Sequence, residues 1–338
     1  MTDNLYQIPI SIVLPVYNGE QYIRETIDSL LSQTFREFEL IIINDASTDN
    51  TVSIINQYND PRIVRVDNEI NRRLIYTLNR GVSLCRGKYI ARIDADDIAL
   101  PDRLQTQFDF MEAHPETGIC GCSIEIFNAE KEFTQRVDFA GSDLDIRAFA
   151  FFQSPFNHPS VLLRRSVIEQ NHLQYPDSYL HAEDYGLWIE ILKYTQGANI
   201  RKVLTRYRKH EKSITALDDR QMNNRIEILV RLHTQYLNQN GIELTAEQMQ
   251  IYTPFTDRSL PYKITGAGQQ AIACVLKDFL KQLSQKQPAL FPGVQHYLSV
   301  NTFYKFFINR KIPRNTFLLK LYCSGVIYYI KRKLLKKG

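Results

Sequence analysis

The first part of the chain alternates between short apolar runs and longer segments in which apolar residues recur at helical spacing. Residues 8–16 and 38–44 are almost wholly apolar and rich in β-branched residues, as is typical of strands buried on both faces. Shorter runs of the same kind predict further strands at 63–66, 88–93 and about 119–127. Apolar residues spaced three and four apart predict helices over 22–31, from about 51, over 74–84 and from just after Pro101 to His114.

Strands that alternate with helices at this spacing predict βαβ units, and so an α/β fold with a mostly parallel sheet flanked by helices. Right-handed crossovers then place the carboxyl end of every strand at one edge, where ligands of open α/β sheets bind. Polar residues follow the strands at these ends: Tyr17 and Asn18, Asp45, and Asp94 to Asp97. We therefore expect them to converge on one crevice.

The rest of the chain has a different pattern. Residues 130–215 mix short elements, and from about Asp218 the apolar spacing becomes helical. We expect a first domain over 1–215, with one half at about 1–128 and the other at about 129–215. A mainly helical C-terminal region is expected over 216–338.

Charge is divided unevenly along the 338 residues, although 41 basic and 37 acidic residues nearly cancel. Residues 279–338 contain twelve Lys or Arg and no Asp or Glu, which leaves 29 basic and 37 acidic residues in the remainder. General binding of nucleic acid requires a basic surface that displaces counterions, so the acidic body disfavours nucleic acid as a partner. The tail alone is suited to a polyanion.

Cysteine usage and the terminal segments favour a cytoplasmic protein. The five cysteines are odd in number and include no CxxC pair, which indicates reduced thiols and argues against zinc. The N-terminus lacks a basic segment followed by an apolar one, so we expect no secretory signal. The longest apolar stretch, 316–330, is interrupted by Lys320 and is shorter than the roughly 20 residues that a spanning helix needs.

Carboxylates at a strand end carry the main chemical signal. Residues 15–20 contain one glycine where a dinucleotide fingerprint has three, and a Walker P-loop is absent. Asp94, Asp96 and Asp97 lie within four residues and repel one another unless a cation or hydrogen-bond donors compensate them. Such a DxD motif suits Mg²⁺ or Mn²⁺ bound together with a diphosphate, although aspartates also serve as caps at strand-to-helix turns.

Four ordered motifs then resemble those of a known family: residues 15–18 (PVYN), 44–49 (NDASTD), 87–97 (GKYIARIDADD) and 181–188 (HAEDYGLW). Together they are similar to the motifs of family 2 inverting glycosyltransferases with the GT-A fold, of the bacterial cell-surface polysaccharide type, over about residues 8–215. The resemblance implies transfer of a sugar from a nucleoside-diphosphate sugar, a UDP-sugar, to a hydroxyl of a saccharide or lipid-linked acceptor.

The resemblance also implies roles for individual residues. Asp45 is expected to contact the base, Asp94 the ribose and sugar side, and Asp96 the metal, with His210 of the YRKH segment as a second metal contact. Where the family commonly has glycine this chain has Arg73, which either crowds the base pocket or adds a donor to it. The expected donor-binding residues are Pro15, Val16, Tyr17, Asn18, Glu20, Asp45, Arg73, Asp94, Ala95 and Asp96.

On the acceptor side, Asp184 resembles the family's catalytic base, with Glu183 as the second choice. His158 is expected to shape the acceptor site, and Trp188, one helical turn beyond Asp184, to form its wall or to stack on a sugar. For His158 a structural role in its loop, and for Trp188 a place in the core, are the alternatives.

The basic tail interleaves Lys and Arg with aromatic and aliphatic residues, which favours peripheral contact with an anionic membrane at the inner face of the cell membrane. The alternative is a helical subdomain with a solvated basic end. Two rival functions also remain at this point: a nucleotidyltransferase of similar fold, which attacks phosphorus, and a catalytically silent nucleotide-sugar-binding protein.

Overall fold

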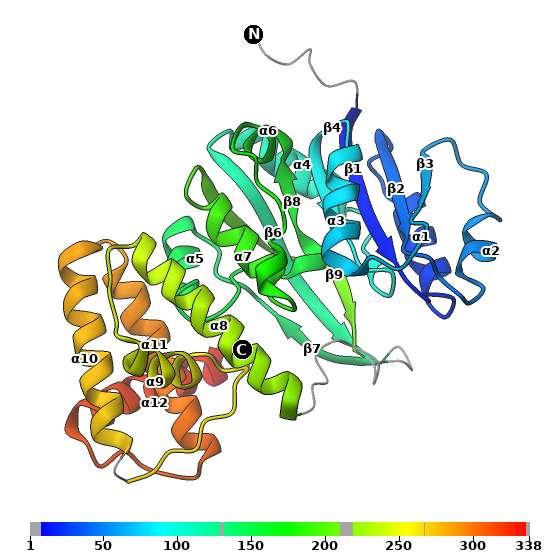
Figure 1. Ribbon diagram of the computed structural model, residues 1–338. Coiled ribbons are helices and arrows are strands. Elements are labelled where there is room, and N and C mark those ends of the chain that lie inside the picture. Colours follow the sequence, from blue (N-terminus) through cyan, green and yellow to red (C-terminus); the bar gives the residue numbers. More distant parts are fainter. Residues whose placement is uncertain (1–7, 129–131, 210–218, 267, 336–338) are drawn as a thin grey trace. The chain divides into compact units, whose positions relative to one another are not determined.

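The computed structural model describes residues 8–128, 132–209, 219–266 and 268–335 (Figure 1). The chain divides into two compact units. The first comprises Met1–Asp143 and Phe156–Ala216, and the second comprises Leu144–Pro155 and Leu217–Gly338. The second unit thus includes a short segment, Leu144–Pro155, that lies in the sequence between two parts of the first.

One nine-stranded sheet forms the centre of the first unit, in the order β3-β2-β1-β4-β8-β6-β9-β5, with β7 paired to β6. Its strands are β1 (Ile8–Val16), β2 (Phe38–Asn44), β3 (Ile63–Asp67), β4 (Gly87–Arg92), β5 (Ile98–Ala99), β6 (Thr117–Phe127), β7 (Phe133–Val137), β8 (Leu162–Arg164) and β9 (Gln196–Arg208). Strands β1 to β4 are mutually parallel. Beyond β4 the sheet is mixed, because β8 runs antiparallel to both β4 and β6 while β9 runs parallel to β6.

Helices cover both faces of the parallel part of this sheet. They are α1 (Ile23–Leu31), α2 (Thr51–Ile55), α3 (Arg73–Leu84) and α4 (Arg103–Ala113), with α6 (Arg165–Gln170) and α7 (Glu183–Ile191) farther along the chain. Ile12 and Leu14 of β1 belong to a buried cluster with residues of α1 and α4. On the opposite face a Cβ on Gly81 of α3 would lie 2.6 Å from Val13 and 2.9 Å from Ile43. The predicted α/β fold with helices on both faces is confirmed.

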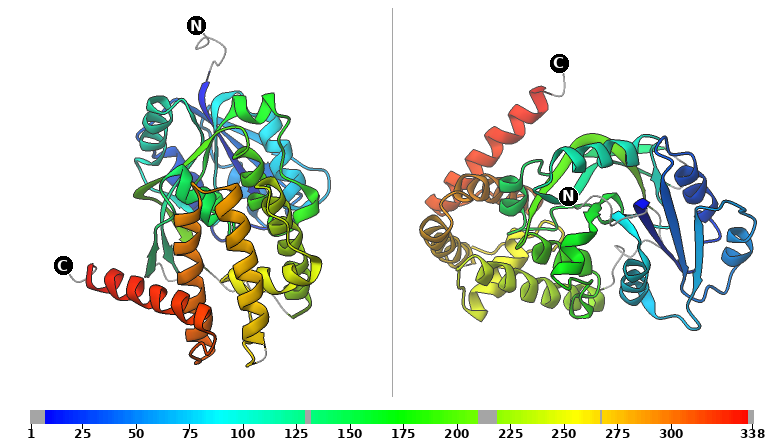
Figure 2. Two further views of the ribbon diagram at one scale, coloured as in Figure 1. Left: turned by 90° about the vertical axis from the view of Figure 1, so that its left-hand side faces the viewer. Right: turned by 90° about the horizontal axis from the view of Figure 1, so that it is seen from above.

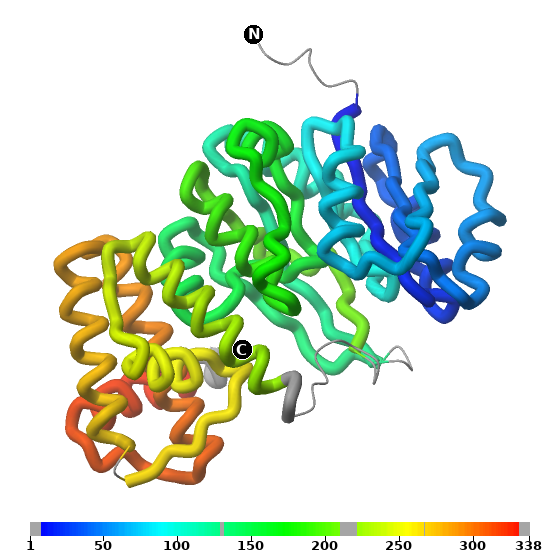
Figure 3. The backbone as a smooth tube through the Cα atoms, in the orientation of Figure 1, coloured from blue at the N-terminus to red at the C-terminus, as the bar shows by residue number. Residues whose placement is uncertain are grey.

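The loops that follow β1, β2 and β4 lie at one edge of the sheet (Figure 3). The backbone N–H of Asn18, after β1, donates to Ser47 Oγ after β2 at 2.9 Å. The hydroxyl of Thr26 in α1, the helix that follows this first loop, donates to the carbonyl of Ala95, after β4, at 2.9 Å. The sheet thereby gathers three polar loops that are far apart in the sequence.

The second unit is helical, as the sequence predicts for its C-terminal part. It contains most of α5 (Asp143–Phe149), and α8 (Asp219–Gln239), α9 (Ala246–Thr256), α10 (Gly268–Lys286), α11 (Phe291–Ile308) and α12 (Thr316–Leu335). Edge-to-face rings of Tyr252 and Phe279, 5.1 Å apart, form part of its core. Helices α11 and α12 approach closely at Gly325, where a Cβ would lie 2.4 Å from the carbonyl oxygen of Ser299. None of the helices in the described ranges is long and apolar enough to cross a membrane.

Candidate active site

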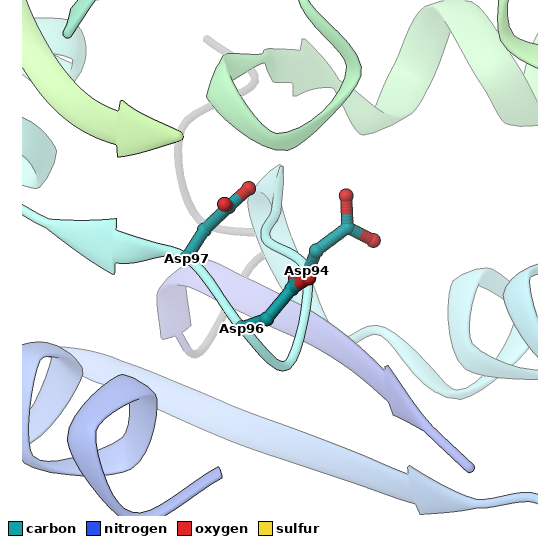
Figure 4. A group of neighbouring side chains, drawn as sticks. All are labelled: Asp94, Asp96 and Asp97. Atoms are coloured by element: carbon teal, nitrogen blue, oxygen red, sulfur yellow. The ribbon is translucent and has the colours of Figure 1, made fainter. Parts of the chain in front are cut away.

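Three aspartates follow β4 on one loop, and Figure 4 shows their side chains on it. Asp94, Asp96 and Asp97 each offer a carboxylate oxygen, and these oxygens lie within 4.8 Å of one another. Thr26 Oγ1 of α1 fixes the loop by donating to the carbonyls of Ala95 and Asp97, both at 2.9 Å. A set of carboxylate oxygens at this spacing fits a hard divalent cation such as Mg²⁺ or Mn²⁺.

The three carboxylates differ in how far solvent and ligands can reach them. Asp94 and Asp96 are partly exposed, whereas Asp97 is fully buried. One oxygen of Asp97 accepts the N–H of Arg208 at 2.8 Å, and its Oδ2 has no hydrogen-bond partner among the described residues. Burial, together with repulsion from Asp96 and Asp94, raises the pKa of Asp97 well above its ordinary value. Asp94 and Asp96 are therefore the two carboxylates that a cation could reach, and Asp97 supports the loop from inside.

Arg92, the last residue of β4, neutralises Asp94. Its guanidinium is almost completely buried and donates to both oxygens of Asp94, one of them at 2.6 Å. A buried arginine that binds a carboxylate through two bonds fixes both position and orientation. Asp94 is thus held at the strand end, where it stays partly exposed.

Arg208, the last residue of β9, clamps the aspartate loop from the other side. It is 1% exposed, its Nε donates to the carbonyl of Asp96 at 2.8 Å, and its Nη2 pairs with Glu25 of α1 at 2.5 Å. The guanidinium also lies over the rings of Tyr22 and Phe127, 4.3 and 4.4 Å from their centroids. The backbone that presents Asp96 is therefore bound to both α1 and β9.

The loop after β1 contains several of the predicted donor-binding residues, and the structure gives them different tasks. Pro15 and Val16 are buried at the end of β1, so their side chains support the loop rather than line a pocket. Asn18 Oδ1 accepts from the N–H of Thr48 at 2.8 Å, and Glu20 accepts from Asn50 at 2.7 and 3.0 Å. These two side chains join the loops after β1 and β2. Tyr17, whose side chain is 50% exposed, is the residue here that offers a ring to a ligand.

Asp45 is predicted to contact the base, but its carboxylate is used to hold the start of α3. It is buried, and it accepts hydrogen bonds from Asn68 Nδ2 at 2.6 Å and from the N–H groups of Arg72 and Arg73 at 2.8 Å each. Its direct contribution is to orient this turn. Arg73 has a φ of 66°, a conformation that favours glycine, which explains why the family commonly has glycine there. Its exposed side chain points out of this fixed turn.

Aromatic rings pack around His158 and Trp188, which the sequence assigns to the acceptor side, and the expected stacking role of Trp188 is corrected. Trp188 is fully buried, with its ring edge-on to those of Phe156, His158 and Tyr175 at 5.8 to 6.2 Å. A buried indole exposes no face for stacking on a sugar, so Trp188 is a core residue that supports its neighbours. His158, in a short 3-10 helix, places Nε2 3.1 Å from the Tyr175 hydroxyl. Burial lowers the pKa of His158 well below its ordinary value, and it is held as a neutral imidazole.

Glu183 and Asp184 form the first turn of α7, where the helix dipole favours negative charge. Glu183 is 6% exposed, and burial, followed by repulsion from Asp184, raises the pKa of Glu183 to about 7. Asp184 is more accessible, and its charge acts on both Asp94 and Tyr175. The predicted base therefore lies in the electrostatic neighbourhood of the aspartate loop.

A prediction follows for Glu183. Because the folded state holds its pKa at about 7 against 4.5 in the unfolded chain, the fold favours the protonated form. This contribution to stability is present below about pH 4.5 and is lost as the pH rises to about 7. The free energy of unfolding of the wild-type protein should therefore fall over this window relative to that of Glu183→Gln.

Urea denaturation measured at several pH values tests this, with Trp188, the single tryptophan, as the fluorescent probe of the first unit. Parallel pH profiles for the two proteins would contradict the assignment. The control is Glu190→Gln on the same helix, where Glu190 pairs with Lys193 near the surface.

The structure thus brings together most of the predicted residues at the edge where β1, β2 and β4 end. His210 lies outside the described residues, so its expected metal contact stays a prediction. Sequence reasoning missed Arg92, Arg208 and Tyr175 as site residues. Two of them carried a signal: Arg92 is a charge within a buried strand next to Asp94, and Arg208 belongs to the YRKH segment.

Comparisons with known proteins agree with this geometry. The model of the glycosyl transferase family 2 matches residues 11–171. An uncharacterized glycosyltransferase of Haemophilus influenzae is 31% identical over 246 residues, which cover 70% of this chain and 76% of that protein. The Escherichia coli protein WfaP, named UDP-Glc:alpha-D-GlcNAc-diphosphoundecaprenol beta-1,3-glucosyltransferase, is 32% identical over 209 residues, or 61% of this chain and 80% of WfaP.

The fold is shared with solved structures as well. The crystal structure of residues 1–349 of S. aureus TarS in complex with UDP-GlcNAc covers 96% of this chain and 92% of that one, with a TM-score of 0.60 and 18% identity. At this identity the likeness shows the fold, which is GT-A. The sequence relationship to the H. influenzae protein shows the family: this chain belongs to glycosyltransferase family 2.

Proposed function

We propose that this protein transfers a sugar from a UDP-sugar to a hydroxyl of a saccharide or lipid-linked acceptor, with inversion at the anomeric carbon, in the synthesis of a surface polysaccharide. The observation that carries the proposal is the cluster of Asp94, Asp96 and Asp97 after β4, whose carboxylate oxygens lie within 4.8 Å of one another. A single displacement needs a base for the acceptor's proton and compensation for the departing diphosphate. We assign the first role to Asp184 and the second to a cation held by the aspartate loop.

The relatives support the choice of substrates. WfaP is named for a UDP-glucose donor and a diphosphoundecaprenol-linked acceptor, and TarS was crystallised with UDP-GlcNAc. We extend the same classes of donor and acceptor to this chain. With a lipid-linked acceptor, the reaction takes place at the inner face of the cell membrane.

In the proposed reaction the acceptor oxygen forms a bond to the anomeric carbon from the side opposite the leaving group. The bond from that carbon to the diphosphate oxygen breaks, and its electron pair leaves with UDP. Asp184 accepts the proton of the acceptor hydroxyl. Glu183 is the second candidate: its pKa of about 7 would suit a base near neutrality, but its side chain is almost completely buried, whereas Asp184 is more accessible to an acceptor.

The aspartate loop holds the donor's diphosphate end. Asp96 and Asp94 are the carboxylates that would bind Mg²⁺ or Mn²⁺, with His210 as a further ligand. A bound cation supplies positive charge to the departing diphosphate. Arg208 and Thr26 keep the loop in place during the reaction. Tyr17 and Arg73 face the nucleotide, and Asp45 fixes the turn that carries Arg73.

Product analysis of the full-length chain tests this function. With Mn²⁺ and a panel of sugar nucleotides, we expect release of UDP from a UDP-sugar, faster with a saccharide or lipid-linked acceptor than with water. A nucleotidyltransferase would instead release pyrophosphate from a nucleoside triphosphate and a sugar phosphate. A protein that binds UDP-sugars but turns over none of the acceptors offered would favour the silent nucleotide-sugar binder and contradict the proposal.

A further inference from the structure

An exposed group of aromatic rings lies on α11 and α12 of the second unit. The ring of Phe303 contacts those of Phe307, Tyr322 and Tyr329, with centroids 5.6, 5.5 and 5.3 Å away. Phe307 and Tyr329 are 63% and 43% exposed. We call these four residues the aromatic ridge. Figure 2 shows that the end of α12 extends beyond the other helices of the second unit.

Aliphatic side chains near the ridge in the sequence are exposed as well. Ile308, Ile312, Ile327 and Ile330 are all at least half exposed, at 56%, 70%, 55% and 50%. Leu318 of α12, by contrast, is completely buried. Apolar side chains exposed singly are ordinary on a protein surface, but exposed rings in mutual contact, with exposed aliphatic residues near them in the sequence, favour a binding surface.

The charge around the ridge identifies the kind of partner. Residues 279–338 contain twelve basic and no acidic residues. Arg310, Arg314 and Lys320 are exposed close to the ridge in sequence, and positions 331–333 of α12 follow Tyr329 within about one helical turn. The partner must therefore accept apolar and aromatic side chains and also carry negative charge.

A second copy of this chain does not meet that description. A symmetric dimer through the ridge would bring two surfaces of the same positive sign together, and like charges at an interface oppose association. An anionic lipid surface does meet it, because aromatic rings settle at the level of the headgroups while Lys and Arg bind the phosphates. Lys320 and the bases of 331–333 also suit a helix that lies on the bilayer rather than across it.

We propose that the aromatic ridge and the basic residues beside it dock this protein on the surface of an anionic membrane. The proposed function gives the docking its purpose, since a lipid-linked acceptor is presented there. The docking itself requires neither donor nor acceptor. It can therefore be tested separately from sugar transfer.

The test is co-sedimentation of the full-length chain with vesicles of phosphatidylcholine alone and of phosphatidylcholine mixed with phosphatidylglycerol. We expect binding to the anionic vesicles only, and weaker binding at high salt because surface charges are screened. The double substitution Phe307→Ser and Tyr329→Ser should lower the partition coefficient about tenfold or more. The pair Arg314→Gln and Lys320→Gln should lower it as well and reduce its salt dependence.

Two matched controls separate the ridge from a general loss of hydrophobic surface. Phe133→Ser and Tyr194→Ser remove aromatic side chains of the first unit that are 60% and 54% exposed, and they should bind vesicles as the wild-type protein does. Unchanged UDP affinity in every variant shows that the first unit is intact. Far-UV circular dichroism shows that the helices of the second unit are kept.

Three results would overturn the proposal. The first is equal binding of the wild-type protein to neutral and anionic vesicles. The second is a folded Phe307→Ser and Tyr329→Ser variant that binds as strongly as the wild-type protein. The third is absence of binding to either vesicle. A stable dimer in light scattering that the ridge substitutions dissociate would assign the ridge to self-association instead. If vesicle binding fails while UDP release from a UDP-sugar persists, the docking surface is wrong and the proposed function stands; the reverse outcome rejects the function alone.

Discussion

Asp184→Asn is expected to lower the rate of sugar transfer by about a hundredfold to ten-thousandfold while leaving UDP affinity unchanged within about twofold. The substitution keeps the size of the side chain but removes the group that accepts the acceptor's proton. Asp184 lies in the first turn of α7, and its charge is a minor cause, after burial, of the raised pKa of Asp94, which supports placing it beside the donor's reacting end. Transfer is measured as acceptor-dependent UDP release and UDP affinity by calorimetry.

Glu190→Gln serves as the matched control for this experiment. Glu190 lies on the same helix, but its carboxylate pairs with Lys193 at 2.7 Å near the surface, so its loss should leave transfer unaffected. A slow Asp184→Asn enzyme with normal UDP affinity supports the base. If turnover is unchanged in Asp184→Asn but falls in Glu183→Gln, the base is Glu183, and the assignment of Asp184 is wrong.

Arg208→Gln is expected to destabilise the first unit by about 2 kcal/mol, because it removes the hydrogen bonds of a buried guanidinium, although its partner Glu25 is 35% exposed. The substitution removes the bond from Nε to the Asp96 carbonyl, the pair with Glu25 and the contacts with the rings of Tyr22 and Phe127. Urea denaturation followed by Trp188 fluorescence reports on this unit alone, since Trp188 is the single tryptophan. Under folded conditions the same variant should require more Mn²⁺ for UDP binding, because the backbone of Asp96 is no longer held.

The control for Arg208 lies two residues earlier on the same strand. Arg206 pairs with Glu125 at 3.0 Å, and both side chains are substantially exposed, at 50% and 30%. An exposed pair of this kind is worth under about 1 kcal/mol, so Arg206→Gln should be nearly neutral. Equal losses of stability in the two variants, or an unchanged Mn²⁺ requirement in folded Arg208→Gln, would show that Arg208 does not position the aspartate loop.

The parallel half of the fold is predictable from the sequence because its strands are buried on both faces. The apolar runs at 8–16 and 38–44 coincide with β1 and β2, since burial on both faces leaves few polar positions within them. The second half of the sheet is harder to predict. β8 has three residues, and β9 mixes buried and exposed positions and pairs with β6 through shifts of register. Such strands carry no clear period in a single sequence.

The position of the candidate site is predictable for the same reason, but the task of each side chain is not. Parallel strands bring residues 17–18, 45 and 94–97 to one edge, whatever those residues then do. The side chains of Asn18 and Asp45 accept hydrogen bonds from neighbouring loops, and Trp188 lies in the core. These outcomes depend on which donors surround each group in space. The sequence does not show this, because the partners lie 23 to 30 residues away.

The most direct test of the central claim is a calorimetric titration of UDP into the full-length wild-type protein, with Mn²⁺ and with EDTA, repeated with Asp96→Asn. The aspartate loop is proposed to hold the diphosphate through a divalent cation. We therefore predict that wild-type protein binds UDP at least about tenfold more tightly with Mn²⁺, and that Asp96→Asn shows the weak affinity under both conditions. UDP binding that depends neither on Mn²⁺ nor on Asp96 would contradict the account.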